Sequence, residues 1–424
     1  MCRTMGFSMN SAEIRSSVTE ALEATPVFDM HTHTFAPWMG GLGLWGIDEL
    51  VTYHYLEAEL FRSSAITPER YFSLSREQKA DEIWQALFVR NAPISEATRG
   101  VVAVLKAFGL ATGAKDLGEA REFFRTRRID EHIDHVFRLA GVSEVVMTND
   151  PLDPAEAPCW SAARRDPRFH AALRLDRILN RWSEHWQTLE SQGYRVQADG
   201  NGWSMAEVRR FLADWVRRME PRYMAVSLPD TFQYPEDSLR ARLLAGAVLP
   251  SCREHGIPMA LMIGVRYQVN PALRLAGDGV GRADLRAVES LCREFPDNRF
   301  LVTVLSRENQ HELCVYARKF ANLMPFGCWW FLNNPSIVSE ITRERIEMLG
   351  AGFIPQHSDA RILEQVIYKW RFSRRVIADA LAGAYGLLEA DGREVTRAMI
   401  EQDVRRLMRG NFEAWTGRSG AAKA

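Results

Sequence analysis

Residues 26–34 read PVFDMHTHT, a stretch that joins a short apolar run to two closely spaced histidines. Seven more apolar runs follow along the chain. Most are continuous rather than alternating, which is typical of strands buried on both faces of a parallel sheet. They are EVVMT at 144–148, FHAALRL at 169–175, YMAVSLP at 223–229, IPMALMIG at 257–264, RFLVTVL at 299–305, LMPFGCWWF at 323–331 and GFIPQHS at 352–358. Together with residues 26–31, these runs predict eight strands.

Helical patterns separate most of these runs, for example at 205–218, 283–294 and 308–320. Eight strands that alternate with helices predict an α/β fold, a closed (β/α)₈ TIM-like barrel. The alternative is an open, doubly wound sheet, whose first strand would lead into a glycine-rich turn. Residues 31–38 read HTHTFAPW and contain no GxGxxG turn, so the sequence favours the barrel.

The spacing of the runs also predicts where the barrel is interrupted. The segment between the first two runs is far too long for one helix, and its pattern is mostly helical. We therefore expect a single catalytic unit with an N-terminal helix and the first strand at 1–44, a helical insertion at 45–140, and the rest of the barrel with C-terminal helices at 141–424. An insertion after the first strand lies at the carboxyl-terminal face of a barrel, where active sites are built.

The composition excludes several classes of protein. The 424 residues carry a formal net charge of −1, which gives no electrostatic reason to expect nucleic acid or an acidic membrane surface as a partner. No stretch approaches 18 uncharged apolar residues, and residues 1–10 lack the basic and apolar regions of a signal peptide. The six cysteines form no CxxC pair. We expect a cytoplasmic protein that crosses no membrane.

His31 and His33 come directly after the first predicted strand. Residues i and i+2 of a strand point to the same face, so the two imidazoles project together and can reach one transition-metal ion. They also stand at the carboxyl end of the strand, which is the catalytic end of a barrel. The alternative is a pair of histidines on a surface loop. The apolar lead-in favours metal ligation.

Asp359 follows the last predicted strand in the stretch QHSD at 356–359. In a closed barrel the last strand pairs with the first, so this carboxylate can approach His31 and His33 from the neighbouring strand. The alternative is that Asp359 caps a helix that begins near Arg361. We favour ligation, and the prediction depends on closure of the barrel.

The middle strands lack further ligands. Barrel hydrolases with two metals use a modified Lys and additional His residues there, yet the runs at 223–229, 257–264 and 299–305 contain neither type. The sequence therefore predicts one divalent metal with three protein ligands and open positions for substrate oxygens. Zn²⁺ suits a site of two histidines and one aspartate, and Mn²⁺, Fe²⁺ and Co²⁺ remain alternatives.

Other polar and aromatic residues fall on the predicted catalytic face. Arg174 ends the third strand and Arg361 follows Asp359, and two arginines there suggest an anionic substrate, with surface ion pairing as the alternative. Trp329 and Trp330 end the seventh strand, where aromatic residues can line a sugar site or pack in the core. His54 and Tyr55 lie in a helix of the insertion, where the residues alone favour packing over a base role for Tyr55.

The chain resembles the uronate isomerases (glucuronate isomerases) of the amidohydrolase superfamily over essentially its whole length. The similarity rests on VFDMHTHTF at 27–35, LVTYHYLEAE at 50–59, VVMTNDPLD at 145–153, FHAALRLD at 169–176, FGCWWFLNN at 326–334 and FIPQHSDARILEQ at 353–365. It is strongest to a divergent branch of the family that carries the motifs MTNDP, LSRENQHEL and PQHSDAR.

The resemblance implies conversion of D-glucuronate to D-fructuronate and of D-galacturonate to D-tagaturonate. It implies a metal on His31, His33 and Asp359, a catalytic base at Tyr55, and substrate contacts from His54, Arg174 and Arg361. The larger branch of the family has a histidine on strand 5 where this chain has Met262. The divergent branch shares that loss.

The leading hypothesis is therefore a metal-assisted aldose–ketose isomerase that acts through a cis-enediol, with Tyr55 and Asp359 as catalytic residues. A mononuclear metal-dependent hydrolase, such as a lactonase or a decarboxylase-like relative, is the alternative on the same fold. A barrel that binds a sugar without catalysis is a third reading. We expect a small-molecule hexuronate as the substrate and a homo-oligomeric assembly.

Overall fold

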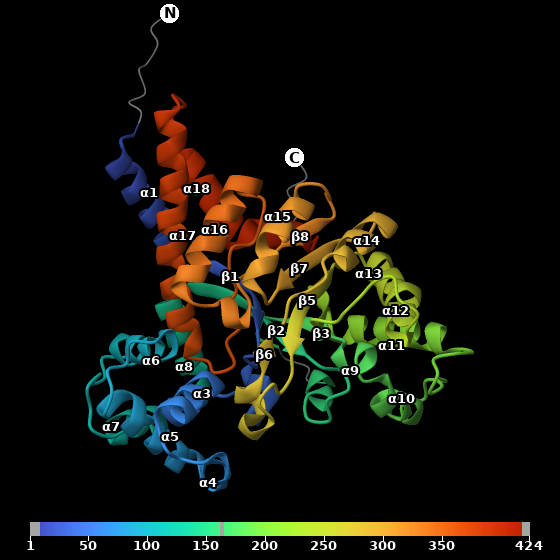
Figure 1. Ribbon diagram of the computed structural model, residues 1–424, viewed down its shortest axis with the longest axis horizontal. Coiled ribbons are helices and arrows are strands. Elements are labelled where there is room, and N and C mark those ends of the chain that lie inside the picture. Colours follow the sequence, from blue (N-terminus) through green and yellow to red (C-terminus); the bar gives the residue numbers. More distant parts are fainter. Residues whose placement is uncertain (1–8, 162–164, 418–424) are drawn as a thin grey trace, which may run out of the picture.

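The computed structural model describes residues 9–161 and 165–417 (Figure 1). In this part of the chain, the strands form one sheet in the order β1-β2-β3-β4-β5-β7-β8, with neighbours parallel along that path. The strands are β1 (Val27–Thr32), β2 (Val142–Asn149), β3 (Phe169–Arg174), β4 (Tyr223–Pro229), β5 (Met259–Arg266), β6 (Gly279–Val280), β7 (Phe300–Val304) and β8 (Leu323–Pro325). The short β6, which the sequence did not predict, pairs antiparallel with β5.

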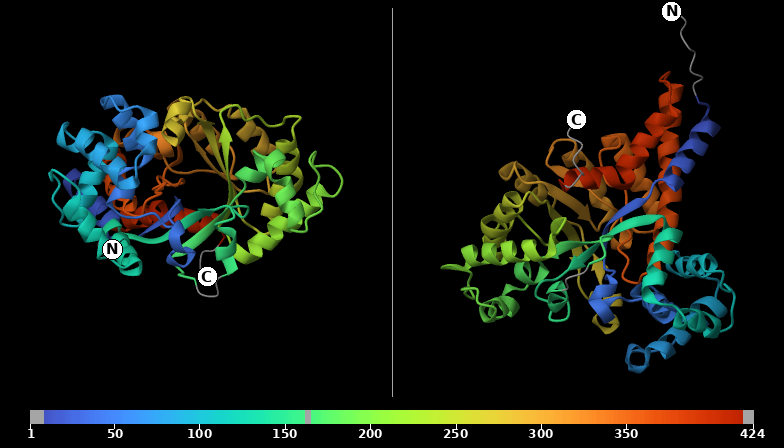
Figure 2. Two further views of the ribbon diagram at one scale, coloured as in Figure 1. Left: turned by 90° about the horizontal axis from the view of Figure 1, so that it is seen from below. Right: turned by 180° about the vertical axis from the view of Figure 1, so that it is seen from behind.

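Helices lie outside the strands, as the view from below shows (Figure 2, left). Those that alternate with the strands are α9 (Asp176–Leu179), α10 (Trp182–Ser191), α11 (Ser204–Met219), α12 (Leu239–Leu243), α13 (Leu249–Glu254), α14 (Arg286–Glu294), α15 (Gln310–Ala317) and α16 (Pro335–Leu349). The sheet and its surrounding helices confirm the (β/α)₈ TIM-like fold class.

Local sequence signals set the ends of several helices. The side chain of Asn334 accepts a hydrogen bond from the backbone N–H of Ile337, and Pro335 occupies the first turn, so α16 begins there. The same helix ends at Gly350, whose φ of 61° suits glycine. The helix α8 (Ile129–Ala140) also ends at a glycine, Gly141, whose left-handed conformation leads directly into β2.

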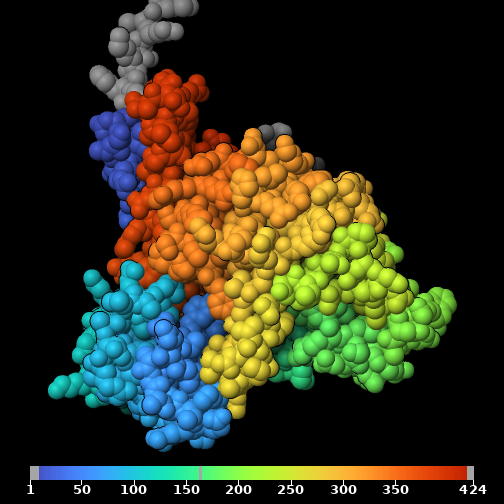
Figure 3. Space-filling view, viewed as in Figure 1, coloured from blue at the N-terminus to red at the C-terminus, as the bar shows by residue number. Residues whose placement is uncertain are grey.

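The segment between β1 and β2 is helical. It contains α2 (Ile47–Val51), α3 (His54–Ser63), α4 (Pro68–Ser73), α5 (Arg76–Trp84), α6 (Glu96–Ala107), α7 (Gly118–Arg125) and α8 (Ile129–Ala140). In Figure 3 these helices, in blue and cyan, lie beside the yellow segment around β6. One contact there is the Arg274 guanidinium, which lies 4.0 Å from the centre of the Phe72 ring.

Terminal helices pack on the barrel and on this segment. α1 (Ser11–Ala24) contacts α17 (Gln365–Ala390), and α18 (Arg397–Arg405) and α19 (Asn411–Trp415) follow. Two fully buried side chains join α8 to the start of α17: His132 Nε2 lies 2.7 Å from Glu364 Oε1. Lys369 of α17 pairs with Glu96 of α6 at 2.9 Å. Polar contacts inside the protein therefore fix the helical segment on α17.

The prediction of a regular eighth strand at 352–358 is wrong, yet the residues of this segment close the barrel. Ile354 exchanges backbone hydrogen bonds with the β8 side, donating to Pro325 O at 3.1 Å and accepting from Gly327 N at 2.8 Å. On the other side, Asp359 N donates to His31 O at 3.1 Å and His33 N donates to Ala360 O at 2.7 Å. Segment 354–360 therefore bridges β8 and β1.

Physical reasons for the irregularity are visible in the segment itself. Pro355 has no N–H to donate to a ladder. The N–H of Ser358 donates to the Asp29 side chain at 3.0 Å instead of to a backbone carbonyl. Asp359 has a φ of 52°, which strand geometry does not allow. The seventh predicted strand, at 323–331, is shorter than expected for a similar reason, because Gly327 and Trp330 both have positive φ.

Candidate metal centre

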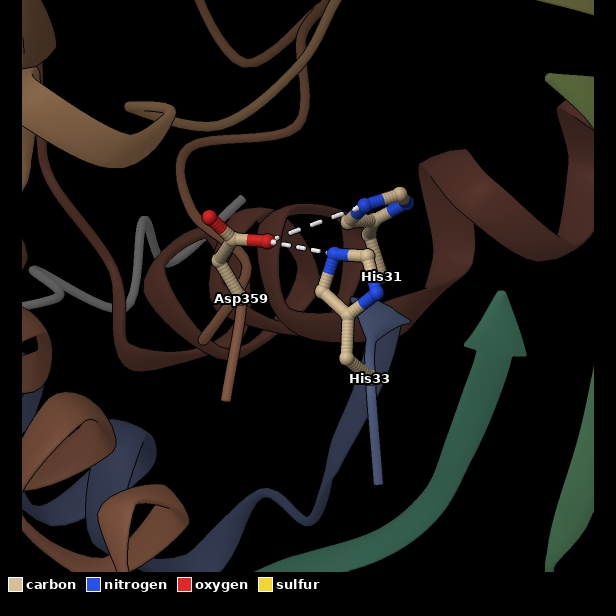
Figure 4. Close-up of side chains that lie close together, drawn as sticks. All are labelled: His31, His33 and Asp359. Atoms are coloured by element: carbon tan, nitrogen blue, oxygen red, sulfur yellow. Dashed lines mark ion pairs between the residues drawn. The ribbon is translucent and has the colours of Figure 1, made fainter. Parts of the chain in front are cut away.

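His31, His33 and Asp359 converge at the carboxyl end of β1 (Figure 4). Asp359 Oδ1 lies 3.7 Å from His31 Nε2 and 3.3 Å from His33 Nε2. One donor atom from each residue can be chosen so that all three lie within 4.8 Å of one another. Ligands at roughly 2.0–2.2 Å from one ion fit such separations. The juxtaposition expected from barrel closure is present.

Backbone hydrogen bonds fix this geometry. The backbone N–H of Asp359 donates a hydrogen bond to the carbonyl oxygen of His31, which places the Asp359 side chain next to the His31 imidazole. Between the two histidines, Thr32 points away and donates to Val146 O at 3.0 Å, as strand alternation requires. α17 begins only at Gln365, with Glu364 at the N-cap position, so the alternative of Asp359 as a helix cap is wrong.

The chemistry of the three groups fits a cation. Asp359 Oδ1 is buried and lacks a hydrogen-bond partner among the described residues, although its neighbours are two imidazole nitrogens. Burial lowers the pKa of His31 to about 3 and the pKa of His33 well below its usual range. Both rings are therefore neutral near pH 7, the form that binds metals. An unpaired buried carboxylate oxygen facing two neutral imidazoles is explained by a positive ion between them.

The two predicted arginines line the same pocket as the three candidate ligands. Arg174 is held in place by Asp176, with Nε 2.8 Å and Nη2 3.1 Å from the two carboxylate oxygens. Arg361 forms no ion pair with any described residue, although its backbone N–H donates to Gln365 Oε1 at 2.9 Å. The positive charge of both arginines contributes to the lowered pKa of His33. Such a pocket favours an anionic ligand.

Residues at the start of α3 are divided between two cavities. His54 lines the pocket of the three ligands, while Tyr55 lines a neighbouring cavity with Glu59 and Glu96. Sequence reasoning missed Tyr53, which lines the first pocket and whose ring centre lies 4.9 Å from that of Tyr55. Burial raises the pKa of Tyr53 and Tyr55, while the charge of Arg361 lowers that of Tyr53. The stretch YHY at 53–55 was the available signal.

The predicted tryptophans also line the pocket. Trp330 begins a 3₁₀ helix, Trp330–Leu332, with a φ of 47°, an unusual conformation for a bulky residue that often marks a functional position. Its Nε1 is buried without a hydrogen-bond partner in the described residues, and so is His54 Nε2. The two rings meet edge to face at 5.8 Å between centres. These unsatisfied groups suit a polar ligand.

Two further positions bear on the sequence analysis. Met262, where the larger family branch has a histidine, lies on β5 and lines the pocket with its side chain almost fully buried. His357 is fully buried with its ring centre 5.3 Å from that of His31, and it is not one of the three grouped donors. Pocket residues that the sequence did not single out include Thr148, Asp176, Ser227, Tyr267 and Asp278.

Fold and site together define a (β/α)₈-barrel enzyme with a three-residue cation site at the carboxyl ends of its strands. No protein-family model matches the sequence, and no curated protein matches it either. Among solved structures, the uronate isomerase of Bacillus halodurans C-125 is 50% identical, with a TM-score of 0.95 over 97% of this chain and 98% of that chain. The chain therefore belongs to the uronate isomerase family.

Two more distant structures share the fold. The uronate isomerase of Thermotoga maritima is 16% identical, with a TM-score of 0.79 over 96% of this chain and 98% of that chain. The glucuronate isomerase of Caulobacter crescentus is 13% identical, with a TM-score of 0.74 over 97% of this chain and 95% of that chain. No helix in the described residues is long and apolar enough to cross a membrane.

Proposed function

We propose that this chain interconverts D-glucuronate with D-fructuronate and D-galacturonate with D-tagaturonate, by metal-assisted proton transfer through a cis-enediol. One observation carries the proposal: a cation site of His31, His33 and Asp359 shares its pocket with Arg361, which pairs with no described acid. A hexuronate has a carboxylate for the arginine and adjacent oxygens for the cation. The full-length similarity to a uronate isomerase supports the same substrate class.

Two neutral imidazoles and a carboxylate would hold one divalent ion, for which we propose Zn²⁺, with Mn²⁺, Fe²⁺ and Co²⁺ as alternatives. When bound, such an ion supplies positive charge that stabilises negative charge developing on the C1 and C2 oxygens. Asp359 has a second proposed role, which is to carry a proton between those two oxygens during the reaction.

The remaining predicted residues are proposed to hold the sugar acid. Arg361 and Arg174 bind the carboxylate, and Asp176 keeps the Arg174 guanidinium oriented. Trp330 Nε1 and His54 Nε2, which lack partners among the described residues, are proposed to bond substrate oxygens. Trp329 completes the aromatic wall of the pocket.

Proton transfer at carbon requires a base, and we propose Tyr55 for it. The base takes the proton from C2, the C1 oxygen gains a proton, and an enediol forms. The C2 oxygen then loses its proton and C1 receives one, which completes the ketose. Tyr53 lines the pocket, and its ring centre lies 4.9 Å from that of Tyr55. Burial raises the pKa of Tyr53, and the charge of Arg361 opposes that rise. Positioned acids and bases of this kind contribute roughly 10²–10⁴-fold in rate.

The test is a panel of hexuronates incubated with metal-loaded protein and assayed for ketose by NMR in D₂O. Formation of fructuronate from glucuronate, with or without deuterium at C1, is expected. If no hexuronate is converted while a lactone or ester is hydrolysed, the protein is a mononuclear hydrolase and the proposal is wrong. The 50% sequence identity to a uronate isomerase, over nearly the full length of both chains, favours the formation of ketose.

A further inference from the structure

Two hydroxyl groups hold the imidazole of His31 on the side away from Asp359. Tyr223 Oη, at the start of β4, lies 2.9 Å from His31 Nδ1, and Thr148 Oγ1, on β2, lies 3.4 Å from it. The opposite nitrogen, Nε2, is the one that faces Asp359. His31 and Tyr223 are 1% and 0% exposed, so bulk water does not compete for these contacts.

The direction of each hydrogen bond follows from the partners of the hydroxyl groups. Tyr223 Oη lies 2.7 Å from the carbonyl oxygen of Met30, and Thr148 Oγ1 lies 2.9 Å from that of Thr32. A carbonyl oxygen only accepts, so each hydroxyl gives its one proton to β1. The hydroxyl oxygens then offer only lone pairs to His31 Nδ1, and Nδ1 must carry the proton.

From this arrangement we infer that Tyr223 is a positioning residue for the metal site. Its hydroxyl holds His31 in the Nδ1–H tautomer and thereby presents the lone pair of Nε2 to the cation. The acceptors that orient the two hydroxyls are the carbonyls of Met30 and Thr32, the neighbours of His31 on its own strand. Strand β1 therefore supplies the ligand and also orients the groups that set its tautomer. This inference rests on the metal site of the proposed function.

A purely structural role for Tyr223 makes a different prediction. Its ring packs edge to face with Phe412, at 6.2 Å between centres, and a phenylalanine would keep that contact. Removal of the hydroxyl leaves His31 Nδ1 with the longer contact to Thr148 as its one remaining partner among the described residues. Partners of metal-binding histidines typically contribute about 10–100-fold to metal affinity. The metal affinity of Tyr223→Phe therefore distinguishes the positioning role from a purely structural one.

The experiment compares Tyr223→Phe with wild type after chelation, using Zn²⁺ as the probe and a competing chromogenic chelator to measure the dissociation constant. We expect Tyr223→Phe to bind Zn²⁺ about 10–100-fold more weakly. Tyr71→Phe is the matched control, because Tyr71 is also 0% exposed and its hydroxyl donates to Glu57 at 2.9 Å within the helical segment. That control should leave Zn²⁺ affinity unchanged. Thr148→Val should weaken binding less than Tyr223→Phe does.

A second readout needs neither metal nor substrate. Nitrogen-15 NMR of metal-free protein with labelled histidine, assigned with a His31→Asn variant, should show His31 protonated at Nδ1 in wild type and as a mixture in Tyr223→Phe. Wild-type His31 protonated at Nε2, or unchanged Zn²⁺ affinity in Tyr223→Phe, would overturn the inference. If both readouts agree with it while no hexuronate is isomerised, the proposed function fails and the positioning role stands.

Discussion

The bond between Trp370 and Asp29 offers a sharp test of how the fold supports the site. Trp370 Nε1, on α17, donates to Asp29 Oδ2 at 2.8 Å, and the other carboxylate oxygen accepts from Ser358 N at 3.0 Å. Asp29 is 0% exposed and Trp370 is 2% exposed. The carboxylate thus joins β1 to α17 and to the residue that precedes Asp359.

The perturbation is Trp370→Phe, which keeps an aromatic ring but leaves Asp29 Oδ2 without its donor. Burial raises the pKa of Asp29 from 3.8 to about 6, and the hydrogen bonds from Ser358 and Trp370 oppose that rise. In wild type the folded state therefore binds this proton more tightly than the unfolded state, and stability falls as pH increases from 3.8 through about 6. Loss of the donor raises the folded pKa further and extends the fall to higher pH.

The magnitude has two parts. The smaller ring leaves a cavity that costs on the order of 1–2 kcal/mol at any pH. A hydrogen bond to a charged group contributes about 1.5–3 kcal/mol, and that part is lost only where Asp29 is ionised. We therefore expect Trp370→Phe to reduce the unfolding free energy by roughly 2.5–5 kcal/mol at pH 8 and by about 1–2 kcal/mol at pH 5.

Urea unfolding at the two pH values measures this difference. Trp84→Phe is the control, because Trp84 is 1% exposed and its Nε1 donates to a neutral acceptor, Ala114 O, at 3.1 Å. Its cost should be the same at both pH values. A Trp370→Phe cost that is equally independent of pH would show that no buried charge on Asp29 depends on the Trp370 donor.

Two further predictions concern the site, and a third concerns Glu156, which lines a neighbouring cavity. Arg361→Gln should raise KM for glucuronate about 10–100-fold with unchanged metal content, since a charge-assisted bond contributes about 1.5–3 kcal/mol; an unchanged KM would remove Arg361 from carboxylate binding. Tyr55→Phe should lower kcat at least about 10²-fold while metal content, measured by elemental analysis, is preserved, and near-normal turnover would exclude Tyr55 as the base. Burial raises the pKa of Glu156 from 4.5 to about 7, so the contribution of this residue to stability falls as pH rises through that range. The unfolding free energy of Glu156→Gln should therefore exceed that of wild type by about 1–2 kcal/mol at pH 8 and equal it at pH 4. Equal pH–stability curves for Glu156→Gln and wild type would contradict the last prediction.

Much of the fold was predictable because buried parallel strands have a simple sequence pattern. The apolar runs at 223–229 and 299–305 correspond closely to β4 and β7, and the patterns at 205–218 and 308–320 correspond to α11 and α15. The helices α2 to α8 fall within the predicted insertion at 45–140. The division of the chain into three segments stays a prediction.

The last barrel strand could not be predicted in detail, because its backbone depends on partners distant in sequence. A buried carboxylate, Asp29, replaces a backbone acceptor there, and Asp359 adopts a positive φ. Hydrophobic pattern carries no information on either feature. The adjacency of Asp359 to His31 was nevertheless predictable, since barrel closure alone requires it.

Pocket residues on the helical segment were harder to assign. Tyr53 and Tyr55 lie at the start of α3, where the direction of each side chain depends on how the segment packs against α17. Tyr53 lines the pocket of the metal site, and Tyr55 lines the neighbouring cavity. The positions of Arg174 and Arg361 were easier to predict, because the carboxyl ends of all barrel strands face one site regardless of loop conformation.

The most direct test is to follow ketose formation from D-glucuronate by NMR while Zn²⁺ is added stepwise to chelated wild-type protein. We predict negligible fructuronate without metal and a rate that rises to a plateau at one equivalent per chain, with Asp359→Asn inactive throughout. Full isomerisation by the metal-free protein, or no ketose at any metal content, would contradict a uronate isomerase built on the cation site of His31, His33 and Asp359.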